Sequence, residues 1–273
     1  MQKEDSIYRS PWKYDVEPFH IADNVYYVGN SSVSIHLFDA SEGVLLLDTG
    51  YPQTTYLLLE SIRKAGFKPE NIRWILHSHA HIDHFGATRM LVEKFGCKTY
   101  MPQADIPLLN EKSELNWCDE ADIPYTPPFD TWFDVDFAVK SGDVLSFGNM
   151  TVTAYSAAGH TPGTMAYVFS LPSGLRAAMH GGIGWNTLRS DYIRKHNLGN
   201  SWREAYINSM NSLENLEVDI VLGNHPNQAK MFQKNASKTK TLNPFIDKNE
   251  WGNIIRQTRN GALAMFEKDP IEV

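Results

Sequence analysis

One short run of residues constrains this chain more than any other feature. The segment 76–84 reads LHSHAHIDH and places four histidines and one carboxylate within eight positions. It follows an apolar stretch and precedes a helical pattern, so it is expected to be a loop at the carboxyl end of a strand, where open α/β sheets place their ligand sites. Histidine is costly to bury, and charged imidazoles repel one another. A polar loop without a role is the other interpretation, and the density of imidazoles counts against it.

The spacing within this run indicates two metal sites. His79 and His81 are two positions apart, so in an extended loop both rings can point to the same side. Asp83 and His84 are adjacent, so their side chains must diverge, which suits a second, neighbouring ion. Imidazole and carboxylate are ligands of the kind that zinc prefers.

The pattern His-Xaa-His-Xaa-Asp-His resembles the signature of the metallo-β-lactamase fold superfamily. Two later segments, 158–164 and 221–226, each follow an expected strand and are similar to further motifs of that family. The resemblance extends over about residues 24–266. It implies two zinc ions per chain, the first held by His79, His81 and His160 and the second by Asp83, His84 and His225.

Asp48 also ends an expected strand, in the segment 47–50 that reads LDTG. This segment matches the early Asp-Thr-Gly or Asp-Gly-Gly element of the family. The resemblance implies that Asp48 orients the metal ligands rather than binding metal itself. A turn aspartate bonded to its own backbone is the alternative.

The segment 180–186, HGGIGWN, departs from the pattern of many family members, which carry an acidic bridging ligand or a cysteine there. The departure disfavours the glyoxalase II, lactonase and flavodiiron patterns. It is similar instead to the third β-lactamase subclass, whose second zinc uses an Asp, His, His set, and the segment 243–247 also resembles that subclass. His180 stays open as an extra ligand or a packing residue. Trp185 and Asn186 are candidates for the wall of the substrate pocket.

Alternating and apolar segments separated by helical patterns predict an α/β fold. The run 43–48 is continuous and apolar, typical of a strand buried on both faces. Helices are expected at 54–65, 85–95, 201–216 and 250–266, and further strands at 25–28, 33–38, 72–76, 144–147, 152–156, 166–170, 176–179 and 219–222. The strand–helix order implies parallel pairing in the first half. Two halves of similar order predict two packed sheets with helices outside, a four-layer αββα sandwich.

No linker divides the sequence, so we expect a single domain over 1–273, with an irregular N-terminal arm at about 1–20 whose aromatic residues pack onto it. The segment 103–132 is rich in proline and acid and is expected to be a loop, with 117–132 a candidate lid. Cys97 is expected to be a small buried hydrophobe. A solvated basic face is expected at Lys230, Lys234, Lys238 and Lys240.

The formal net charge of −7 disfavours non-specific binding to nucleic acid or to a membrane surface. No apolar run approaches membrane-spanning length, and the polar N-terminus shows no signal peptide. These features predict a cytoplasmic protein, although a chain trimmed of its leader would look the same. The expected partner is a small molecule with a hydrolysable acyl bond.

The resemblance implies a zinc-dependent hydrolase that opens a cyclic, β-lactam-like amide through a metal-bound hydroxide. Asp83 is expected to orient that hydroxide and to move its proton. A lactonase or thioesterase acting on a cytoplasmic acyl metabolite is the alternative, because β-lactamases of this kind work outside the cytoplasm. The acidic charge disfavours a nuclease. His81, standing where the di-iron oxygen reductases place a carboxylate, disfavours that class, and six intact candidate ligands disfavour a non-catalytic binding module.

Overall fold

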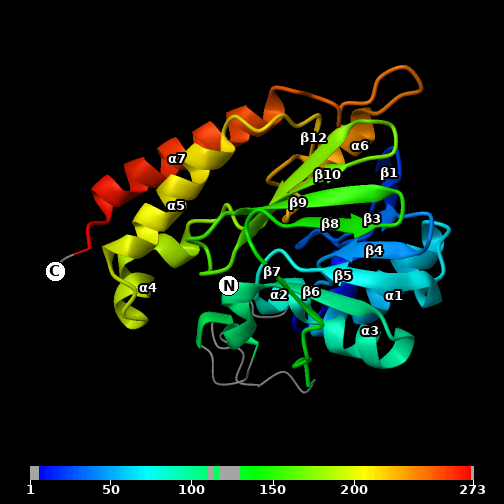
Figure 1. Ribbon diagram of the computed structural model, residues 1–273, viewed down its shortest axis with the longest axis horizontal. Helices are drawn as coiled ribbons and strands as arrows, with labels where there is room; N and C mark the ends of the chain where they lie inside the picture. Colours follow the sequence, from blue (N-terminus) through cyan, green and yellow to red (C-terminus); the bar gives the residue numbers. More distant parts are fainter. Residues whose placement is uncertain (1–5, 110–113, 117–129, 272–273) are drawn as a thin grey trace.

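Two β-sheets packed face to face, with helices on both outer sides, form the protein (Figure 1). The computed structural model describes residues 6–109, 114–116 and 130–271. The first sheet has the strand order β1-β2-β3-β4-β5-β6-β7, and the second has the order β12-β11-β10-β9-β8. The predicted αββα sandwich is therefore confirmed.

The first sheet is antiparallel from β1 to β4 and parallel from β4 to β7. Its strands are β1 (Phe19–Ala22), β2 (Val25–Tyr27), β3 (His36–Asp39), β4 (Val44–Leu47), β5 (Ile72–Leu76), β6 (Lys98–Pro102) and β7 (Phe137–Val139). The parallel pairing of β4 with β5 confirms the expectation from the strand–helix order. The short strand β7 was not predicted.

The second sheet is built differently, because β8 to β11 are antiparallel and only the pairing of β11 with β12 is parallel. Its strands are β8 (Val144–Phe147), β9 (Met150–Ser156), β10 (Met165–Ser170), β11 (Arg176–His180) and β12 (Ile220–Val221). Short turns join β8 to β9 and β10 to β11, so these neighbours pair as hairpins.

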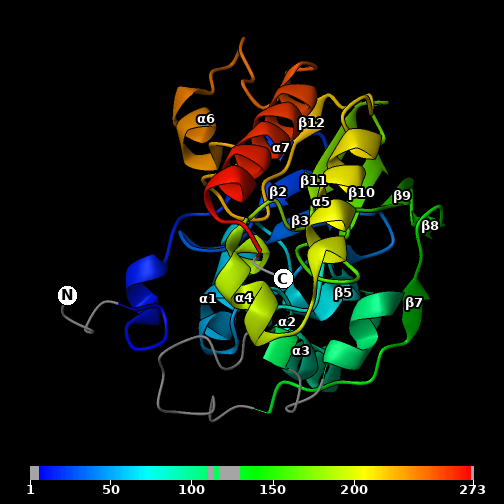
Figure 2. The ribbon, with the colours of Figure 1, turned by 90° about the vertical axis from the view of Figure 1, so that its left-hand side faces the viewer.

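The longer helices cover the two outer faces of the sandwich, α1 and α3 on the first sheet and α5 and α7 on the second (Figures 1 and 2). The α-helices are α1 (Thr55–Lys64), α2 (Ile82–Phe85), α3 (Thr88–Phe95), α4 (Ser190–Lys195), α5 (Asn200–Leu213), α6 (Met231–Ser237) and α7 (Glu250–Lys268). Short 3₁₀ turns include η2 (Pro11–Tyr14), η3 (Pro52–Thr54), η5 (Gln103–Leu108) and η6 (Glu114–Asn116). The short helices α4 and α6 were not predicted.

Strand β4 is buried on both faces, as its continuous apolar sequence predicts. Leu45 and Leu47 join the core between the two sheets, whereas Val44 and Leu46 pack with the residues of α1 and α3. Successive side chains of a strand point to opposite faces, so one strand contributes to both layers.

The helix expected at 85–95 is interrupted, which is a correction to the prediction. Helix α2 ends at Phe85 and α3 begins at Thr88. The backbone N–H and the hydroxyl of Thr49 both donate to the carbonyl of His84, at 2.8 and 3.2 Å, so both lone pairs of this oxygen are used outside the helix. The break follows from a contact with residues more than thirty positions away, which local periodicity cannot reveal.

The arm and the basic stretch also differ from expectation. Strand β1 begins within the segment expected to be irregular, and Trp12 is 61% exposed instead of packing onto the domain. Lys234 is buried and forms an ion pair with Glu250, and Lys238 Nζ donates to the carbonyl of Ile21 at 2.8 Å. The predicted solvated face is therefore wrong at Lys234 and Lys238.

Cys97 is buried, as predicted. Much of the candidate lid, residues 117–129, lies outside the described residues. Within the described part of the segment 103–132, the chain forms η5 and η6 rather than an irregular loop throughout. No helix in the described part of the chain combines the length and the apolar character needed to cross a lipid bilayer.

The two sheets are joined by a pair of stacked aromatic rings. Phe38 of β3 and Phe169 of β10 are fully buried, with ring centroids 4.3 Å apart. We expect Phe169→Ala to lower the free energy of unfolding by about 3–5 kcal/mol, because it leaves a cavity between the sheets. Urea unfolding measures the change. Leu242→Ala, at a side chain that is 58% exposed, serves as the control and should change stability by about 0.5 kcal/mol or less. An equal effect of the two substitutions would contradict the proposed importance of this contact.

Candidate metal centre

Four loops from both sheets meet at one end of the sandwich. The loops containing Asp48 and residues 77–84 follow β4 and β5 of the first sheet, and those containing His160 and His225 follow β9 and β12 of the second. Each loop begins where a strand ends. Because the strand is held in its sheet, the side chains that follow it are placed at the sheet edge with little conformational freedom. Segments far apart in the sequence thereby converge.

Three histidines form the first cluster, which we call the first group: His79, His81 and His160. One nitrogen of each lies within 4.8 Å of the others. His79 Nε2 and His81 Nδ1 are 2.9 Å apart, and the His160 ring centroid lies 5.0 Å from that of His79. All three side chains are buried.

Asp83, His84 and His225 form the second group, in which one ligand atom of each residue again lies within 4.8 Å of the others. Asp83 Oδ2 lies 3.3 Å from His84 Nε2 and 3.6 Å from His225 Nε2. The His79 and His84 ring centroids are 4.3 Å apart, so the two groups adjoin. The structure therefore brings together all six side chains that the sequence singles out, in the two triads expected.

Oxygen atoms fix the orientation of four of these rings. His160 Nδ1 donates to the carbonyl of Gly184 at 3.2 Å, and His225 Nδ1 donates to that of Ser32 at 2.8 Å. His84 Nδ1 donates to the carboxylate of Asp48 at 2.8 Å, and His79 Nδ1 lies 2.9 Å from Ser78 Oγ. Because Nδ1 is the donor in these contacts, the lone pair of a neutral ring is on Nε2, the nitrogen that faces the cluster.

Asp48 lies outside the two groups and connects them through hydrogen bonds. Its Oδ1 accepts the backbone N–H of Ser78 at 2.7 Å, and its Oδ2 accepts the Ser78 hydroxyl at 2.7 Å in addition to His84 Nδ1. Since the Ser78 hydroxyl donates to Asp48, its oxygen accepts from His79 Nδ1. Asp48 thus orients His84 directly and His79 through Ser78, and it is not among the residues of either group. Asp48 has a φ of 63°, a left-handed conformation that aspartate tolerates better than most residues.

The two groups differ in protonation. Burial holds the pKa of His79 and His81 well below the ordinary value, and lowers that of His160 to about 4, so these rings are neutral at neutral pH. Burial also lowers the pKa of His84, but the carboxylates of Asp83 and Asp48 outweigh it and raise the pKa to about 10. The neighbouring imidazoles hold the pKa of Asp83 below its usual range despite burial, so its carboxyl group is ionised.

Asp105, which the sequence reading missed, links the two loops of the first group. Its Oδ2 accepts the N–H of Ala80 at 2.8 Å and the hydroxyl of Thr161 at 2.7 Å, and its Oδ1 accepts the N–H of Gly163 at 2.6 Å. Burial outweighs the opposing effect of these hydrogen bonds and raises the pKa of Asp105 to about 6, so the carboxyl group is mostly ionised at neutral pH. Its position shortly after β6, at the same edge of the sheet as the metal loops, is the signal that could have identified it.

Two other histidines near this edge have different surroundings. His77 is held by the carbonyl of Tyr100 at 2.9 Å and the hydroxyl of Thr88 at 2.8 Å, so its ring supports the loop. His180 is buried, and its Nδ1 accepts the backbone N–H of Gly182 at 3.2 Å. His180 does not belong to either group of potential ligands among the described residues.

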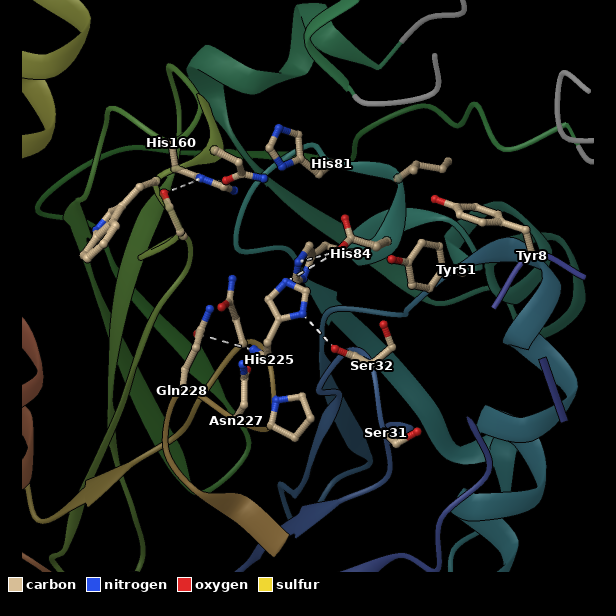
Figure 3. A pocket seen from close by; sticks show the side chains of 18 residues that line it. Tyr8, Ser31, Ser32, Tyr51, His81, His84, His160, His225, Asn227 and Gln228 are labelled. Atoms are coloured by element: carbon tan, nitrogen blue, oxygen red, sulfur yellow. Dashed lines mark hydrogen bonds and ion pairs between the residues drawn. The ribbon is translucent and has the colours of Figure 1, made fainter. Parts of the chain in front are cut away.

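A cavity of about 740 Å³ opens beside the two groups (Figure 3). Trp185 and Asn186, the predicted wall residues, both line it. Trp185 lies against α7 at Gly261, where a Cβ atom would come within 2.2 Å of its ring, so only glycine leaves room for it. The sequence reading did not identify several lining residues on other segments: Tyr8, Ser31, Ser32, Tyr51, Asn224, Asn227 and Gln228.

The donor set fits divalent metal ions. Neutral imidazoles oriented by outer hydrogen bonds are the form in which histidine binds zinc and similar metals, and a carboxylate completes the second group. The burial of His79, His81 and His160 side by side is costly for a protein that gains no ligand from it. Three imidazoles in one group, and two imidazoles with a carboxylate in the other, could each hold one ion.

Comparison with known proteins agrees with this geometry. Residues 28–176 match the family description of the metallo-beta-lactamase superfamily. A probable metallo-hydrolase of Methanocaldococcus jannaschii is 24% identical over 155 residues, which span 56% of this chain and 71% of that protein.

Solved structures are similar over nearly the whole chain. A subclass B3 metallo-beta-lactamase of Bradyrhizobium japonicum superposes with a TM-score of 0.81 at 27% identity, covering 94% of this chain and 96% of that one. The native metallo-beta-lactamase of Legionella gormanii superposes with a TM-score of 0.82 at 26% identity, covering 93% of this chain and 97% of that one. The expected similarity to the third subclass is confirmed.

The charge state of His84 predicts a proton release on metal binding. With a pKa raised to about 10, His84 is protonated below that pH in the metal-free protein, so an ion entering the second group must displace one proton. At pH 7.5 we expect a release of about one proton from this group and none from the neutral first group. The release should vanish as the pH rises through about 10. Calorimetric titration with zinc in buffers of different ionisation enthalpy measures it.

Asp48→Asn is the matched test of this proton release. The substitution removes one of the two carboxylates that raise the pKa of His84, and asparagine tolerates the left-handed backbone at this position. The release at pH 7.5 should fall, whereas Asp39→Asn, on an exposed part of β3, should leave it unchanged. A release that is identical in the parent and Asp48→Asn would show that another group supplies the proton.

Asp105→Asn is expected to weaken metal binding roughly 10- to 100-fold without unfolding the protein. The amide preserves the shape of the carboxyl group, but its NH₂ faces a backbone N–H that the carboxylate accepts, either that of Ala80 or that of Gly163. Competition with a chromophoric chelator measures the affinity. Asp247→Asn, at an exposed position, is the control. Unchanged affinity in Asp105→Asn would mean that the link between the loops does not position the ligands.

Proposed function

The chain belongs to the metallo-β-lactamase superfamily and is a metal-dependent hydrolase, and from this premise we propose that it uses two zinc ions to open a cyclic, β-lactam-like amide. The observation that carries the proposal is the pair of adjoining triads, His79, His81 and His160 beside Asp83, His84 and His225. Two β-lactamase structures that superpose over more than nine-tenths of this chain support the choice of substrate.

We assign the first group to one zinc ion and the second group to the other, with Asp48 and Asp105 positioning the ligands. Zinc at such a site polarises a carbonyl group and lowers the pKa of water towards neutrality. A second ion in the adjoining group would add positive charge for the anion that forms when the acyl bond breaks.

We assign the transfer of the proton from the attacking water to the carboxylate of Asp83. Its carboxyl group is ionised, because the neighbouring imidazoles hold its pKa below the usual range. It lines the cavity directly, so a proton from an attacking water can pass to its carboxylate and from there to the amide nitrogen. No serine or cysteine nucleophile is needed for this reaction.

The size of the cavity suits a small-molecule substrate. A volume of about 740 Å³ lies within the usual range of pockets for drug-sized ligands. The cavity is lined by both groups as well as by Trp185 and Asn186, so a molecule that fills it contacts the reacting centre. A lactone or a thioester would meet the same groups, and a substrate panel separates these possibilities.

The decisive experiment compares three substrates on the zinc-loaded protein and on Asp83→Asn. We expect hydrolysis of a chromogenic cephalosporin to exceed that of a homoserine lactone and of an acyl thioester, and to be abolished by a chelator. Asp83→Asn should lower kcat by roughly 10²- to 10⁴-fold, because the amide cannot accept the proton. Asp191→Asn is the matched control, since its carboxylate is 60% exposed and pairs with Arg189.

Two outcomes would count against the proposal. Equal activity of Asp83→Asn and the parent would remove Asp83 from the mechanism. Turnover of the lactone or the thioester far above that of the cephalosporin would reject the lactam in favour of that substrate.

A further inference from the structure

A glycine in the last helix faces a side chain of the cavity wall. Gly261 lies within α7, although glycine stabilises a helix less than alanine does. Gly261 is not among the residues with a positive φ, so the helical backbone does not require glycine here. A Cβ atom at this position would come within 2.2 and 2.4 Å of two ring carbons of Trp185. The space available, rather than the backbone, therefore requires glycine.

The indole ring of Trp185 lies between the cavity and two helices. It lines the cavity on one side, and on the other it packs against α7 in the gap that Gly261 leaves. The Trp185 side chain also forms a hydrogen bond with the hydroxyl of Tyr206 on α5, and since an indole can only donate, the hydroxyl oxygen accepts. The Tyr206 hydroxyl donates in turn to the carbonyl of Ile183 at 2.7 Å. The ring is thus held against α5 and α7.

Hydrogen bonds fix the backbone on both sides of Trp185. Before it, the carbonyl of Gly184 accepts from His160 Nδ1 at 3.2 Å. After it, the carbonyl of Trp185 accepts the N–H of Leu188 at 2.9 Å, and the carbonyl of Leu188 accepts from Nε of the buried Arg203 at 2.8 Å. This segment therefore cannot shift away from a side chain added on α7 without breaking some of these hydrogen bonds.

Helix α7 is also fixed at both of its ends. Near its start, Trp251 is buried and its indole N–H donates to the carbonyl of Leu213 at 2.7 Å. Just after its end, the carboxylate of Asp269 accepts the N–H of Ser190 at 2.7 Å. Because both the helix and the segment are fixed, a side chain added opposite the indole displaces the tip of the ring, which can turn about its own bonds towards the cavity.

The end of the cavity beside Trp185 adjoins the first group. Its lining there includes Gly182 and Gly184, and a Cβ atom on Gly182 would come within 2.4 Å of the His160 ring. Since these two residues carry no side chain, the indole is the largest group that faces a substrate at this end. The position of the indole therefore decides how large a substituent fits beside the first group.

We propose that Gly261 sets the width of the cavity. The gap that it leaves in α7 lets the Trp185 indole stand back from the first group, so the site accepts substrates with a bulky substituent at this end. Gly261 does not line the cavity itself, so it is a positioning residue that acts through Trp185. This inference rests on the proposed function, because it concerns the substrate of the same site.

The first test uses the zinc-loaded protein and two chromogenic cephalosporins that differ only in their acylamino substituent, acetyl or phenylacetyl. Gly261→Ala should raise KM for the phenylacetyl compound roughly tenfold and for the acetyl compound less than about twofold, with kcat nearly unchanged. Asn260→Ala, at an exposed position of the same helix, is the matched control and should change neither constant. A structural disturbance would affect the two substrates alike.

Trp185→Phe tests whether Gly261 acts through the indole. A phenyl ring lacks the two carbons that Gly261 accommodates, so this variant should shift the preference towards the phenylacetyl compound, opposite to Gly261→Ala. In the Trp185→Phe background, Gly261→Ala should leave the ratio of the two KM values unchanged. It should also raise Tm more than in the parent, because alanine stabilises the helix and no longer displaces a ring. Equal changes of Tm in the two backgrounds would overturn the contact.

Zinc-binding thiols that are not substrates separate this inference from the proposed function. Calorimetry on the zinc-loaded protein compares mercaptoacetate with its α-benzyl derivative. Gly261→Ala should weaken binding of the benzyl derivative roughly tenfold and leave that of mercaptoacetate nearly unchanged. This pattern without turnover of either cephalosporin would overturn the proposed function alone. Equal effects on the two thiols, or the same selective effect in the Trp185→Phe background, would overturn the role of Gly261.

Discussion

Packing five imidazole rings and a carboxylate into one place, four of the rings buried, is the constraint on which the rest of this structure depends. Protonated rings packed with centroids 4.3 to 5.2 Å apart would repel one another, so burial and mutual repulsion keep His79, His81 and His160 neutral. Neutral rings must then be oriented, because each offers one donor and one lone pair. The carbonyl of Gly184 accepts from His160 and that of Ser32 from His225, and the carboxylate of Asp48 accepts from His84, whose raised pKa keeps it protonated in the metal-free protein. The loops have the conformations that bring these oxygen atoms behind the rings.

A sequence can predict those parts of this site whose metal-binding residues lie close together in the chain. The run 76–84 by itself indicates two neighbouring metal sites, and the resemblance of the segments around His160 and His225 to motifs of the family implies the third member of each triad. Asp105 also lies shortly after a strand, but this position was its only signal in the sequence. Its role comes from accepting hydrogen bonds from Ala80 and Thr161, which lie 25 and 56 positions away in the sequence. Neither Asp105 nor its neighbours form a motif.

The same distinction applies to the fold. Strand β4 and helix α1 were predicted from their own sequences, because burial on two faces and an amphipathic pattern are local signals. The break between α2 and α3 depends on Thr49 taking the carbonyl of His84, and the burial of Lys234 depends on Glu250 of α7. In both cases the tertiary partner overrides the local preference. Tyr8 and Tyr51 were not predicted as wall residues for a related reason. A tyrosine can lie in a core as well as in a binding site, and only the tertiary structure decides between the two.

The distribution of the six side chains along the chain also sets an order of assembly. Protein synthesis proceeds from the N-terminus, and the first group is complete once residue 160 has emerged, whereas the second requires residue 225. Asp83 and His84 are made early, yet they lack their third member until β12 has been added to the second sheet. After residue 160 the chain must grow by 65 residues, from position 160 to position 225, before His225 is present. The three residues of the imidazole triad are therefore all present in a growing chain before the second group has its third member.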